Sequence, residues 1–347
     1  MERASAAAVF FLACALFPAA AGARSSAVID DPAYAQAQRL VDIDHGRRLN
    51  LYCIGTGAPT VVFDAGLANW SQIWGLVQPV VARTTRACSY DRAGLGFSDA
   101  ARRPGTSANI ADDLHRLLHA AQIEPPYVLV GHSYGGMNVR LYADLYRDEV
   151  AGLVLDDPSH EEHSQRSIAA DPDAGLAARF AAERAEADRA GLACLAAARA
   201  GFVAGTAIDA ECISSGRNLR YSLAINAVYQ RLQHEPSFLQ ARLWEDQAYD
   251  LDSPAQLMAA RRSYGDLPLV VLTRALSDSA SGLPDDAHGD LAVALHEDLA
   301  GLSTRGVHRV VPDSSHDIHL DQPQAVIDAI LEVVAAARNP AGARAVD

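Results

Sequence analysis

The segment from Tyr127 to Tyr146 constrains the fold of this chain more than any other. It opens with Tyr127-Val128-Leu129-Val130, a continuous apolar run typical of a buried parallel strand. From Met137 onward, apolar residues recur at helical spacing. Between the two lies Gly131-His132-Ser133-Tyr134-Gly135, a G-x-S-x-G sequence. This order predicts a strand, a sharp turn centred on Ser133 and a helix.

The pentapeptide alone is weak evidence, because its three fixed positions recur by chance in roughly a tenth of chains of this length. The strand before it and the helix after it supply the necessary context. A serine on such a turn has strained backbone angles, and the glycines two positions before and after it relieve the crowding. The turn presents the Ser133 hydroxyl at the carboxyl edge of the sheet. Ser133 is therefore the candidate nucleophile.

Short apolar runs alternate with helical patterns from residue 39 onward. Such alternation predicts an α/β fold, with a mostly parallel sheet and helices on both of its faces. The expected strands are Arg39–Asp44, Arg48–Ile54, Thr60–Phe63, Arg86–Tyr90, Tyr127–Val130, Gly152–Leu155, Pro268–Leu272 and Val307–Val311. The expected helices include Ile110–Ala121, Met137–Tyr146 and Asp321–Ala336, the last with Pro323 in its first turn.

The alternation stops between residues 160 and 262, where no clear strand is present. This region is rich in Ala, Arg, Glu and Leu, a composition that indicates several helices. It is too long for a connecting loop. We therefore expect residues 160–262 to form an inserted helical cap between two parts of the sheet domain.

Three further segments resemble those of a known family. Tyr90–Asp99 is similar to the turn after the fourth strand, Asp64–Leu67 to the oxyanion loop after the third, and Ser315–Ile318 to the segment that carries a catalytic histidine. They occur in the order found in the α/β-hydrolase superfamily, which the chain resembles across residues 39–338. The resemblance implies an α/β-hydrolase fold of about eight strands, with its core in residues 24–159 and 263–338 and a C-terminal tail at 339–347.

A serine needs a partner that takes its proton, and histidine suits this task because its usual pKa is near 6.5. His316 follows the last expected strand, and the resemblance implies that this loop places its imidazole over Ser133. His319 is the nearest rival, expected to be a helix-start or surface histidine. We expect His132 to pack behind the turn. His160 and His163 lie at the start of the cap, where they could reach a substrate.

The histidine needs a carboxylate that holds its tautomer and stabilises its charged form. In the family this acid usually follows the seventh strand, where Asp278 falls about one residue late and lacks a flanking glycine. The alternative position follows the sixth strand, where Asp156 and Asp157 stand before Pro158. Proline restricts the backbone of Asp157, which we expect to be extended. Asp157 is the favoured acid, and Asp278 and Asp156 remain alternatives.

The negative oxygen of a tetrahedral intermediate needs two hydrogen-bond donors. The resemblance implies the backbone N–H of Tyr134, directly after the nucleophile, and that of Leu67 in the loop after the third strand. The Tyr134 ring is a weaker candidate for substrate contact. We expect Trp70 to be a buried packing residue. Asp91 and Arg92 are expected to have a structural role.

Export is predicted from the first 23 residues. Arg3 precedes an apolar stretch, and Ala21-Gly22-Ala23 matches a cleavage site, so we expect a signal peptide at 1–23 and a secreted or periplasmic protein. Four cysteines follow, and their spacings match no zinc pattern. The fold implied by the resemblance suggests the disulfides Cys53–Cys88 and Cys194–Cys212, with free thiols as the alternative.

The function implied is that of a serine hydrolase, which cleaves carboxylic esters of small or medium-sized substrates through an acyl-enzyme. The same residues could act on amide, lactone or carbon–carbon bonds or in acyl transfer, and a non-catalytic binding protein of this fold is a remote alternative. No metal or organic cofactor is implied. The net charge of −14 disfavours nucleic-acid partners. We expect no stable membrane insertion after signal cleavage, and the oligomeric state stays open.

Overall fold

The computed structural model describes residues 25–170, 175–203, 205–213, 216–275 and 285–339, with the side chains of 285–289 left out. The predicted signal peptide, the end of the C-terminal tail and the alternative acid Asp278 lie outside these residues.

Eight strands form one sheet in the order β1-β2-β4-β3-β5-β6-β7-β8. The pairs β1/β2 and β2/β4 are antiparallel, and all the other neighbours are parallel. The mostly parallel sheet predicted from the alternating pattern is confirmed. The strands are β1 (Arg39–Asp44), β2 (Arg47–Ile54), β3 (Thr60–Asp64), β4 (Ala87–Tyr90), β5 (Tyr127–His132), β6 (Val150–Asp156), β7 (Leu269–Arg274) and β8 (Gly306–Val311).

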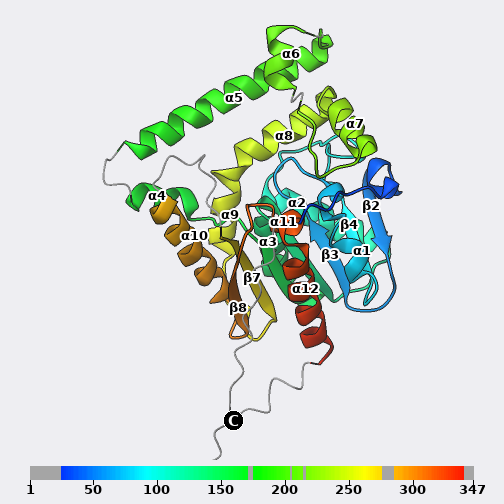
Figure 1. Ribbon diagram of the computed structural model, residues 1–347, viewed down its shortest axis with the longest axis vertical. Coiled ribbons are helices and arrows are strands. Elements are labelled where there is room, and N and C mark those ends of the chain that lie inside the picture. Colours follow the sequence, from blue (N-terminus) through cyan, green and yellow to red (C-terminus); the bar gives the residue numbers. More distant parts are fainter. Residues whose placement is uncertain (1–24, 171–174, 204, 214–215, 276–284, 340–347) are drawn as a thin grey trace, which may run out of the picture.

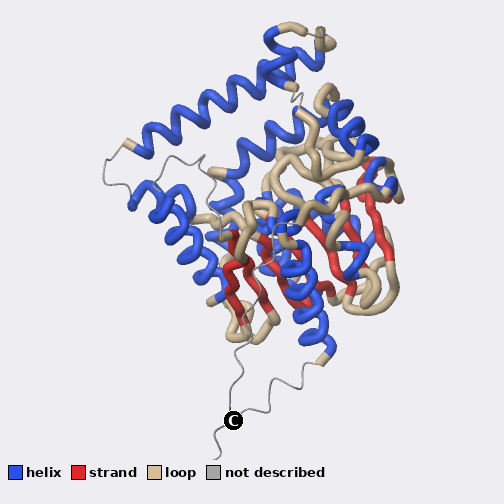
Figure 2. The backbone as a smooth tube through the Cα atoms, viewed as in Figure 1, coloured by secondary structure: helices blue, strands red, loops and turns tan. Residues whose placement is uncertain are grey.

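Helices cover both faces of this sheet (Figures 1 and 2). On one face α2, α3 and α10 pack against the strands, and on the other face α1 and α12 do so. These helices and the short α11 are α1 (Gln78–Val81), α2 (Ser107–Ala120), α3 (Tyr134–Leu145), α10 (Asp285–Ala300), α11 (Ile318–Asp321) and α12 (Pro323–Arg338). Three short 3-10 helices are η1 (Pro32–Ala35), η2 (Ser71–Trp74) and η3 (Arg147–Glu149).

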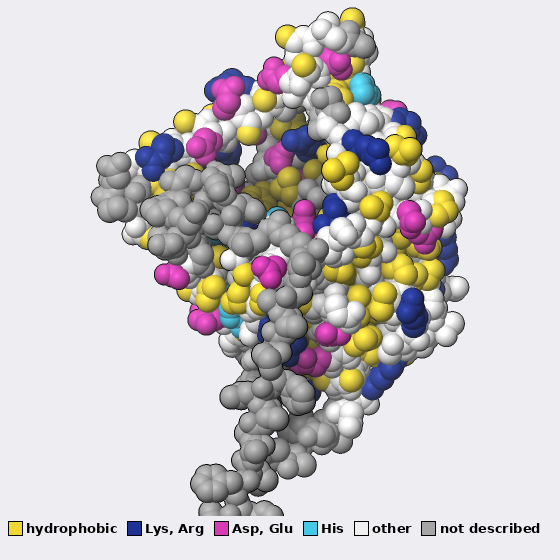
Figure 3. Space-filling view, viewed as in Figure 1, with side chains coloured by type: hydrophobic (Ala, Val, Ile, Leu, Met, Phe, Trp, Pro, Cys, Tyr) yellow, Lys and Arg dark blue, Asp and Glu magenta, His cyan; other side chains and the backbone are white. Residues whose placement is uncertain are grey.

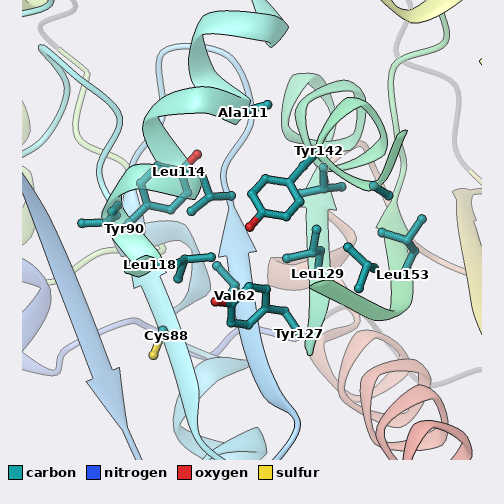
Figure 4. Close-up of a cluster of buried hydrophobic side chains, with 14 of the residues drawn as sticks. Val62, Cys88, Tyr90, Ala111, Leu114, Leu118, Tyr127, Leu129, Tyr142 and Leu153 are labelled. Carbon is teal, nitrogen blue, oxygen red and sulfur yellow. The ribbon is translucent and has the colours of Figure 1, made fainter. Parts of the chain in front are cut away.

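The core divides into two layers because side chains alternate along each strand. In β3, Val62 packs with Leu114 of α2, whereas Val61 and Phe63 pack with the other face. Figure 4 shows the first layer, in which Val62 and Leu129 of the sheet face the side chains of α2 and α3. Burial of each such Val or Leu side chain stabilises the fold by roughly 1.5–3 kcal/mol. The two layers together hold the sheet in place, and the candidate site lies at the carboxyl ends of its parallel strands.

The region predicted as a cap is helical, and within its described part strand pairing is limited to an isolated bridge at Tyr221. Its helices are α4 (His163–Ala170), α5 (Leu176–Ala200), α6 (Ala207–Cys212), α7 (Leu223–Leu232), α8 (Pro236–Tyr249) and α9 (Asp252–Ala260). In Figure 1, α5 and α6 lie outermost and α8 lies between α5 and the core. The last helix, α9, packs directly on α2 and α3. Among the described helices, none has both the length and the apolar character that a membrane span needs.

Both predicted disulfides are present. Cys53 of β2 and Cys88 of β4 are register partners in the antiparallel pair, with their Cα atoms 4.0 Å apart. Cys194 of α5 is bonded to Cys212 of α6, with a Cα separation of 5.4 Å. The first bond therefore joins two strands of the sheet domain, and the second joins two helices of the cap region.

Candidate active site

Ser133 occupies the turn between β5 and α3. Its φ angle is +51°, a left-handed conformation that is strained for a serine. The flanking glycines are required sterically. A Cβ atom on Gly131 would lie 2.4 Å from the Gly135 carbonyl oxygen, and one on Gly135 would lie 2.3 Å from the Asp64 oxygen. The strand, turn and helix predicted around Ser133 are all present.

Asp157 lies directly beyond the end of β6. Its backbone N–H donates to the Leu272 oxygen of β7 at 2.9 Å. Its φ angle is +43°, so the expectation of an extended backbone at Asp157, before Pro158, is wrong. Proline disfavours only the right-handed helical region for the preceding residue, and Asp tolerates the left-handed one. The resulting bend directs the carboxylate toward the loop that follows β8.

His316 lies in that loop, before α11. Its Nδ1 donates to Oδ2 of Asp157 at 2.6 Å, which assigns the ring proton to Nδ1. His132 lies behind it, and the Nε2 of His132 donates to the His316 carbonyl oxygen at 3.0 Å. The sequence placed His132 as a packing residue behind the turn, and this is confirmed. Two of the predicted site residues are thus joined by a short hydrogen bond.

His316 and Asp157 each shift the pKa of the other toward its charged form. Burial by itself lowers the pKa of His316, but the hydrogen bond to Asp157 and the charge of Asp157 outweigh it, so the pKa is raised above the usual 6.5. Burial also acts against the ionised Asp157, yet the hydrogen bond and the positive charges around it lower its pKa to about 2. Asp157 is therefore ionised throughout the neutral range.

Arg274 is a site residue that sequence reasoning missed. It ends β7, and its Nη1 lies 2.5 Å from Oδ2 of Asp157 and 3.2 Å from Nδ1 of His316. Its backbone N–H also donates to Oδ1 of Asp157 at 3.0 Å. Because Nδ1 carries a proton, the two nitrogens share one acceptor rather than bond to each other. No local pattern in the sequence marks this arginine, because its position in the site depends on contacts with Asp157, 117 residues earlier in the chain.

Asp156 pairs with a different histidine. Its Oδ2 accepts from Nδ1 of His319 at 2.8 Å, and both side chains are completely buried. The expectation that His319 is a helix-start or surface residue is therefore half wrong, since it lies in α11 but in the interior. Asp156 is the last residue of β6, whereas Asp157 lies beyond the strand and has a positive φ, so the two carboxylates have different partners. Asp278 lies outside the described residues, so it is not placed relative to His316.

The loop after β3 runs beside the nucleophile. A Cβ atom on Gly66 would lie 2.7 Å from Nδ1 of His132 and 3.3 Å from the Cβ of Ser133, so only glycine permits this approach. Leu67 follows in the loop, and Tyr134 is the first residue of α3. The loop therefore approaches Ser133 at Gly66, directly before Leu67, and Tyr134 follows Ser133 in the chain. The Tyr134 ring is buried, and its hydroxyl donates to the Gly105 oxygen at 2.7 Å.

A buried ion-pair network holds this loop. Arg92 donates to the carbonyl oxygens of Ala65 and Gly66 at 2.6 and 2.7 Å. Its guanidinium also pairs with Asp64 at 2.7 Å and with Glu245 at 2.6 Å, and all three side chains are at most 3% exposed. Glu245 belongs to α8, and its other oxygen accepts from the backbone N–H of Ala68 at 2.8 Å.

This network, here called the loop clamp, consists of Arg92, Glu245 and Asp64. The structural role expected for Arg92 is confirmed, and so is that of Asp91, whose carboxylate accepts from the Ser71 and Phe97 backbones. Glu245 was not predicted, because nothing in the sequence of the cap helices distinguishes a buried glutamate from an exposed one. Trp70 is completely buried and stacks on Tyr229, as expected for a packing residue.

A cavity of about 250 Å³ opens at Ser133, and Asp157 and His316 line it together with Ser133. A second cavity of about 420 Å³ adjoins it and shares His160, His163 and Tyr249 with the first. Figure 3 shows a hollow between α5 and the body of the molecule, with hydrophobic side chains in its wall. Burial lowers the pKa of His160 to about 3, so this histidine is neutral. The two cap histidines singled out from the sequence do line the cavity.

The sequence was found to match a protein-family model. Residues 59–263, more than half of the chain, match the model described as the alpha/beta hydrolase fold. The chain belongs to the α/β-hydrolase family. The match runs from before β3 to beyond α9 and contains Ser133 and Asp157, which confirms the resemblance seen in the sequence.

Curated relatives of this α/β-hydrolase match over shorter stretches. YqjL of Bacillus subtilis is 35% identical over 105 residues, which cover 30% of this chain and 42% of YqjL. An AB hydrolase superfamily protein of Gibberella zeae is 34% identical over 114 residues, 32% of this chain and 35% of that protein. The matched part is less than half the length of each of these relatives.

Solved structures of the same fold cover nearly the whole chain. An esterase from Thermogutta terrifontis, with malate bound, has a TM-score of 0.58 at 23% identity and covers 87% of this chain and 99% of its own. The epoxide hydrolase CorEH has a TM-score of 0.55 at 18% identity, covering 86% and 97%. At these identities the likeness shows that the α/β-hydrolase fold is shared.

Proposed function

We propose that this α/β-hydrolase is a serine hydrolase that cleaves carboxylic esters, with Ser133 as nucleophile, His316 as general base and Asp157 as the orienting acid. The observation that carries the proposal is the 2.6 Å hydrogen bond from Nδ1 of His316 to Asp157, at a cavity that Ser133 also lines. The bond leaves Nε2 as the nitrogen that accepts a proton, which is the form a base needs.

The proposed reaction proceeds in two stages. The Ser133 oxygen attacks the ester carbonyl while His316 takes its proton, and the backbone N–H groups of Leu67 and Tyr134 stabilise the resulting oxyanion. The C–O bond then breaks, and His316 gives its proton to the departing alcohol. In the second stage, water attacks the acyl group on Ser133 while His316 takes a proton from that water. The bond between the acyl carbon and the Ser133 oxygen then breaks, His316 returns the proton to Ser133, and the carboxylic acid is released.

The surroundings of Ser133 support a small or medium-sized substrate. The cavity at the site has a volume of about 250 Å³ and extends into a second cavity of about 420 Å³ under the cap helices. Small-molecule sites in proteins fall in this general range. Amides and lactones would form the same kind of acyl-enzyme, and in acyl transfer an acceptor other than water would take the acyl group from it. A panel of acyl donors with matched acyl groups therefore measures the preference.

We also propose that the protein works in an oxidising compartment after export. Two disulfides are present, and disulfides persist in secreted and periplasmic proteins but rarely in the cytosol. Cleavage near Ala23 is part of this proposal. Mass spectrometry of the protein recovered from the extracellular or periplasmic fraction of its host measures the mature N-terminus.

A fluorophosphonate probe and short nitrophenyl esters test the catalytic proposal. The probe should label the wild-type protein and stop its esterase activity, and Ser133→Ala should lose both labelling and turnover. Ser159→Ala is the matched control, because Ser159 lines the same cavity and its hydroxyl, the group removed, bonds to Tyr249. The backbone N–H of Ser159, which donates to the Ser133 carbonyl oxygen, is kept in this variant. Equal labelling of wild type and Ser133→Ala would refute the proposal.

A further inference from the structure

A cluster of metal-ligating side chains lies on the helix α2, outside the cavity at Ser133. His115 and His119 are four residues apart and therefore lie on the same face of α2. Glu149, at the end of η3, faces them. Nε2 of His115 and Nε2 of His119 lie 3.1 and 2.9 Å from the same oxygen, Oε1 of Glu149. Two imidazole nitrogens and one carboxylate oxygen thus converge on one point.

The spacing of these atoms matches the demands of a tetrahedral metal ion. All three ligand atoms lie within 4.8 Å of one another. In a tetrahedral zinc site with ligand bonds of about 2.0–2.1 Å, neighbouring ligand atoms are about 3.3 Å apart. The two nitrogen–oxygen distances need to increase by only a few tenths of an ångström. His119 is half exposed and His115 about a quarter, so both side chains have room for this shift.

Neighbouring side chains hold the ligands in place. The Tyr142 hydroxyl donates to Oε2 of Glu149 at 2.5 Å, which leaves Oε1 to face the histidines. The His115 ring stacks on Tyr146, with ring centroids 4.0 Å apart and planes 9° from parallel. Partners of this kind orient the ligands and are a regular feature of metal sites. The cluster is therefore more organised than a chance group of surface side chains.

We propose that His115, His119 and Glu149 bind a divalent transition-metal ion, with Zn²⁺ as the natural candidate. Two imidazoles and one carboxylate suit Zn²⁺, Ni²⁺ or Cu²⁺, whereas Mg²⁺ and Ca²⁺ prefer ligands that are all oxygen. Three protein ligands leave one position of the tetrahedron for water. The ion would connect α2 to Glu149, which lies in η3, just after α3. The helices α2 and α3 pack side by side on the sheet.

Zinc binding to the full chain tests this proposal. Isothermal titration with ZnCl₂ alone should show a site that is absent in His119→Ala and in His115→Ala. Glu149→Gln should bind Zn²⁺ at least tenfold more weakly. Saturating Zn²⁺ should raise the Tm of the wild type by a few degrees and that of His119→Ala by less, because a ligand that binds only the folded state stabilises it.

Exposed histidines in general can bind Zn²⁺ weakly, so a matched control is needed. His234 is 45% exposed, similar to His119, and lies outside the cluster. His234→Ala should retain the wild-type zinc affinity and Tm shift. Circular dichroism in the presence of a chelator shows whether each variant is folded. Wild type and a folded His119→Ala that bind Zn²⁺ with equal stoichiometry and affinity would overturn the proposal.

Discussion

Asp156 and Asp157 are consecutive residues with different partners. Asp156 ends β6 and is bonded to His319 in the interior, whereas Asp157 is bonded to His316 at the cavity. The positive φ of Asp157 separates the directions of the two carboxylates. Two adjacent acids can therefore be distinguished experimentally, because only one of them touches the proposed base.

The pH dependence of ester hydrolysis should follow His316. Protonated His316 cannot accept the proton of Ser133, so kcat/KM falls as the pH drops through the pKa of this histidine. Asp157 raises that pKa above 6.5 against the effect of burial. The acid limb of a plot of kcat/KM against pH, measured with a neutral ester, should therefore have its midpoint above 6.5.

The variant Asp157→Asn should move this limb to lower pH, because the charge that raises the pKa of His316 is removed. Its kcat should fall on the order of 10⁴-fold, as expected when the base loses the group that fixes its tautomer. Asp156→Asn provides the control and should change kcat and the limb far less. If both variants lose activity equally and remain folded, the assignment of Asp157 is wrong.

Among the residues of the site, those fixed by local geometry could be predicted. Ser133 lies between two glycines that its turn requires, and His316 follows the last strand. The order of the strands also placed Asp157 at the correct edge. Arg274 and Glu245 could not be predicted, because an arginine or glutamate has no local pattern that announces a buried partner. Their positions depend on contacts between segments far apart in the sequence.

At the scale of elements, the loop clamp links the cap helix α8 to the loop beside Ser133. Arg92 bonds to the carbonyl oxygens of this loop, and Glu245 bonds both to Arg92 and to the Ala68 backbone N–H. The groups are buried, so removal of the Glu245 charge leaves Arg92 paired with Asp64 but takes away the contact that holds the loop at Ala68. Leu67, the proposed oxyanion donor, lies between the bonded residues Gly66 and Ala68.

We predict that Glu245→Gln lowers kcat by about tenfold or more while KM for a short ester changes little. The reason is that the Leu67 N–H loses its fixed position, and outright loss of an oxyanion donor costs about 10²–10³-fold in kcat. Steady-state kinetics with nitrophenyl acetate measures this. Glu245→Asp should also have a lower kcat than the wild type, because the shorter side chain cannot reach both Arg92 and the Ala68 N–H.

A matched control for this prediction is Glu161→Gln. Glu161 is also buried and pairs with Arg140 at 2.7 Å and Arg261 at 2.8 Å, but it has no bond to the loop beside Ser133. It should lower the Tm and leave kcat near the wild-type value. Equal losses of kcat in the two variants would mean that the effect of Glu245 is one of general stability.

The elements themselves were largely predictable. The central buried strands show as apolar runs, and all eight expected segments became strands. Ends were less accurate, because they depend on capping and on tertiary contacts. The helix after Ser133 begins at Tyr134, three residues before the apolar pattern, since the turn itself initiates it. The arrangement of α4 to α9 had no local signal beyond composition.

At the scale of the whole molecule, the two disulfides stabilise different parts. Cys53–Cys88 closes a 35-residue separation within the sheet, and Cys194–Cys212 closes one of 18 residues within the cap region. By loop entropy, the bonds contribute roughly 4 and 3 kcal/mol. The cap helix α5 packs mainly on α6 and α8, so loss of its disulfide acts on local rather than global unfolding.

We therefore predict that Cys53→Ala with Cys88→Ala lowers the Tm of the main transition. Cys194→Ala with Cys212→Ala should lower it less and should increase cleavage by trypsin after the arginines of α5. Thermal unfolding by circular dichroism and limited proteolysis measure these effects, with the reduced wild type as the control. A cap variant that loses as much Tm as the sheet variant, without faster cleavage, would contradict this division.

The hydrogen bond between Asp157 and His316 joins residues 159 positions apart in the chain. Helices form from nearer neighbours, and contacts between distant residues form slowly because a long loop must close first. The proposed triad is therefore assembled only after β8 has joined the sheet and the intervening cap has been accommodated. A refolding chain would regain its helical content before it regains turnover. The recovery of the proposed esterase activity during refolding would therefore report on the last stage of folding.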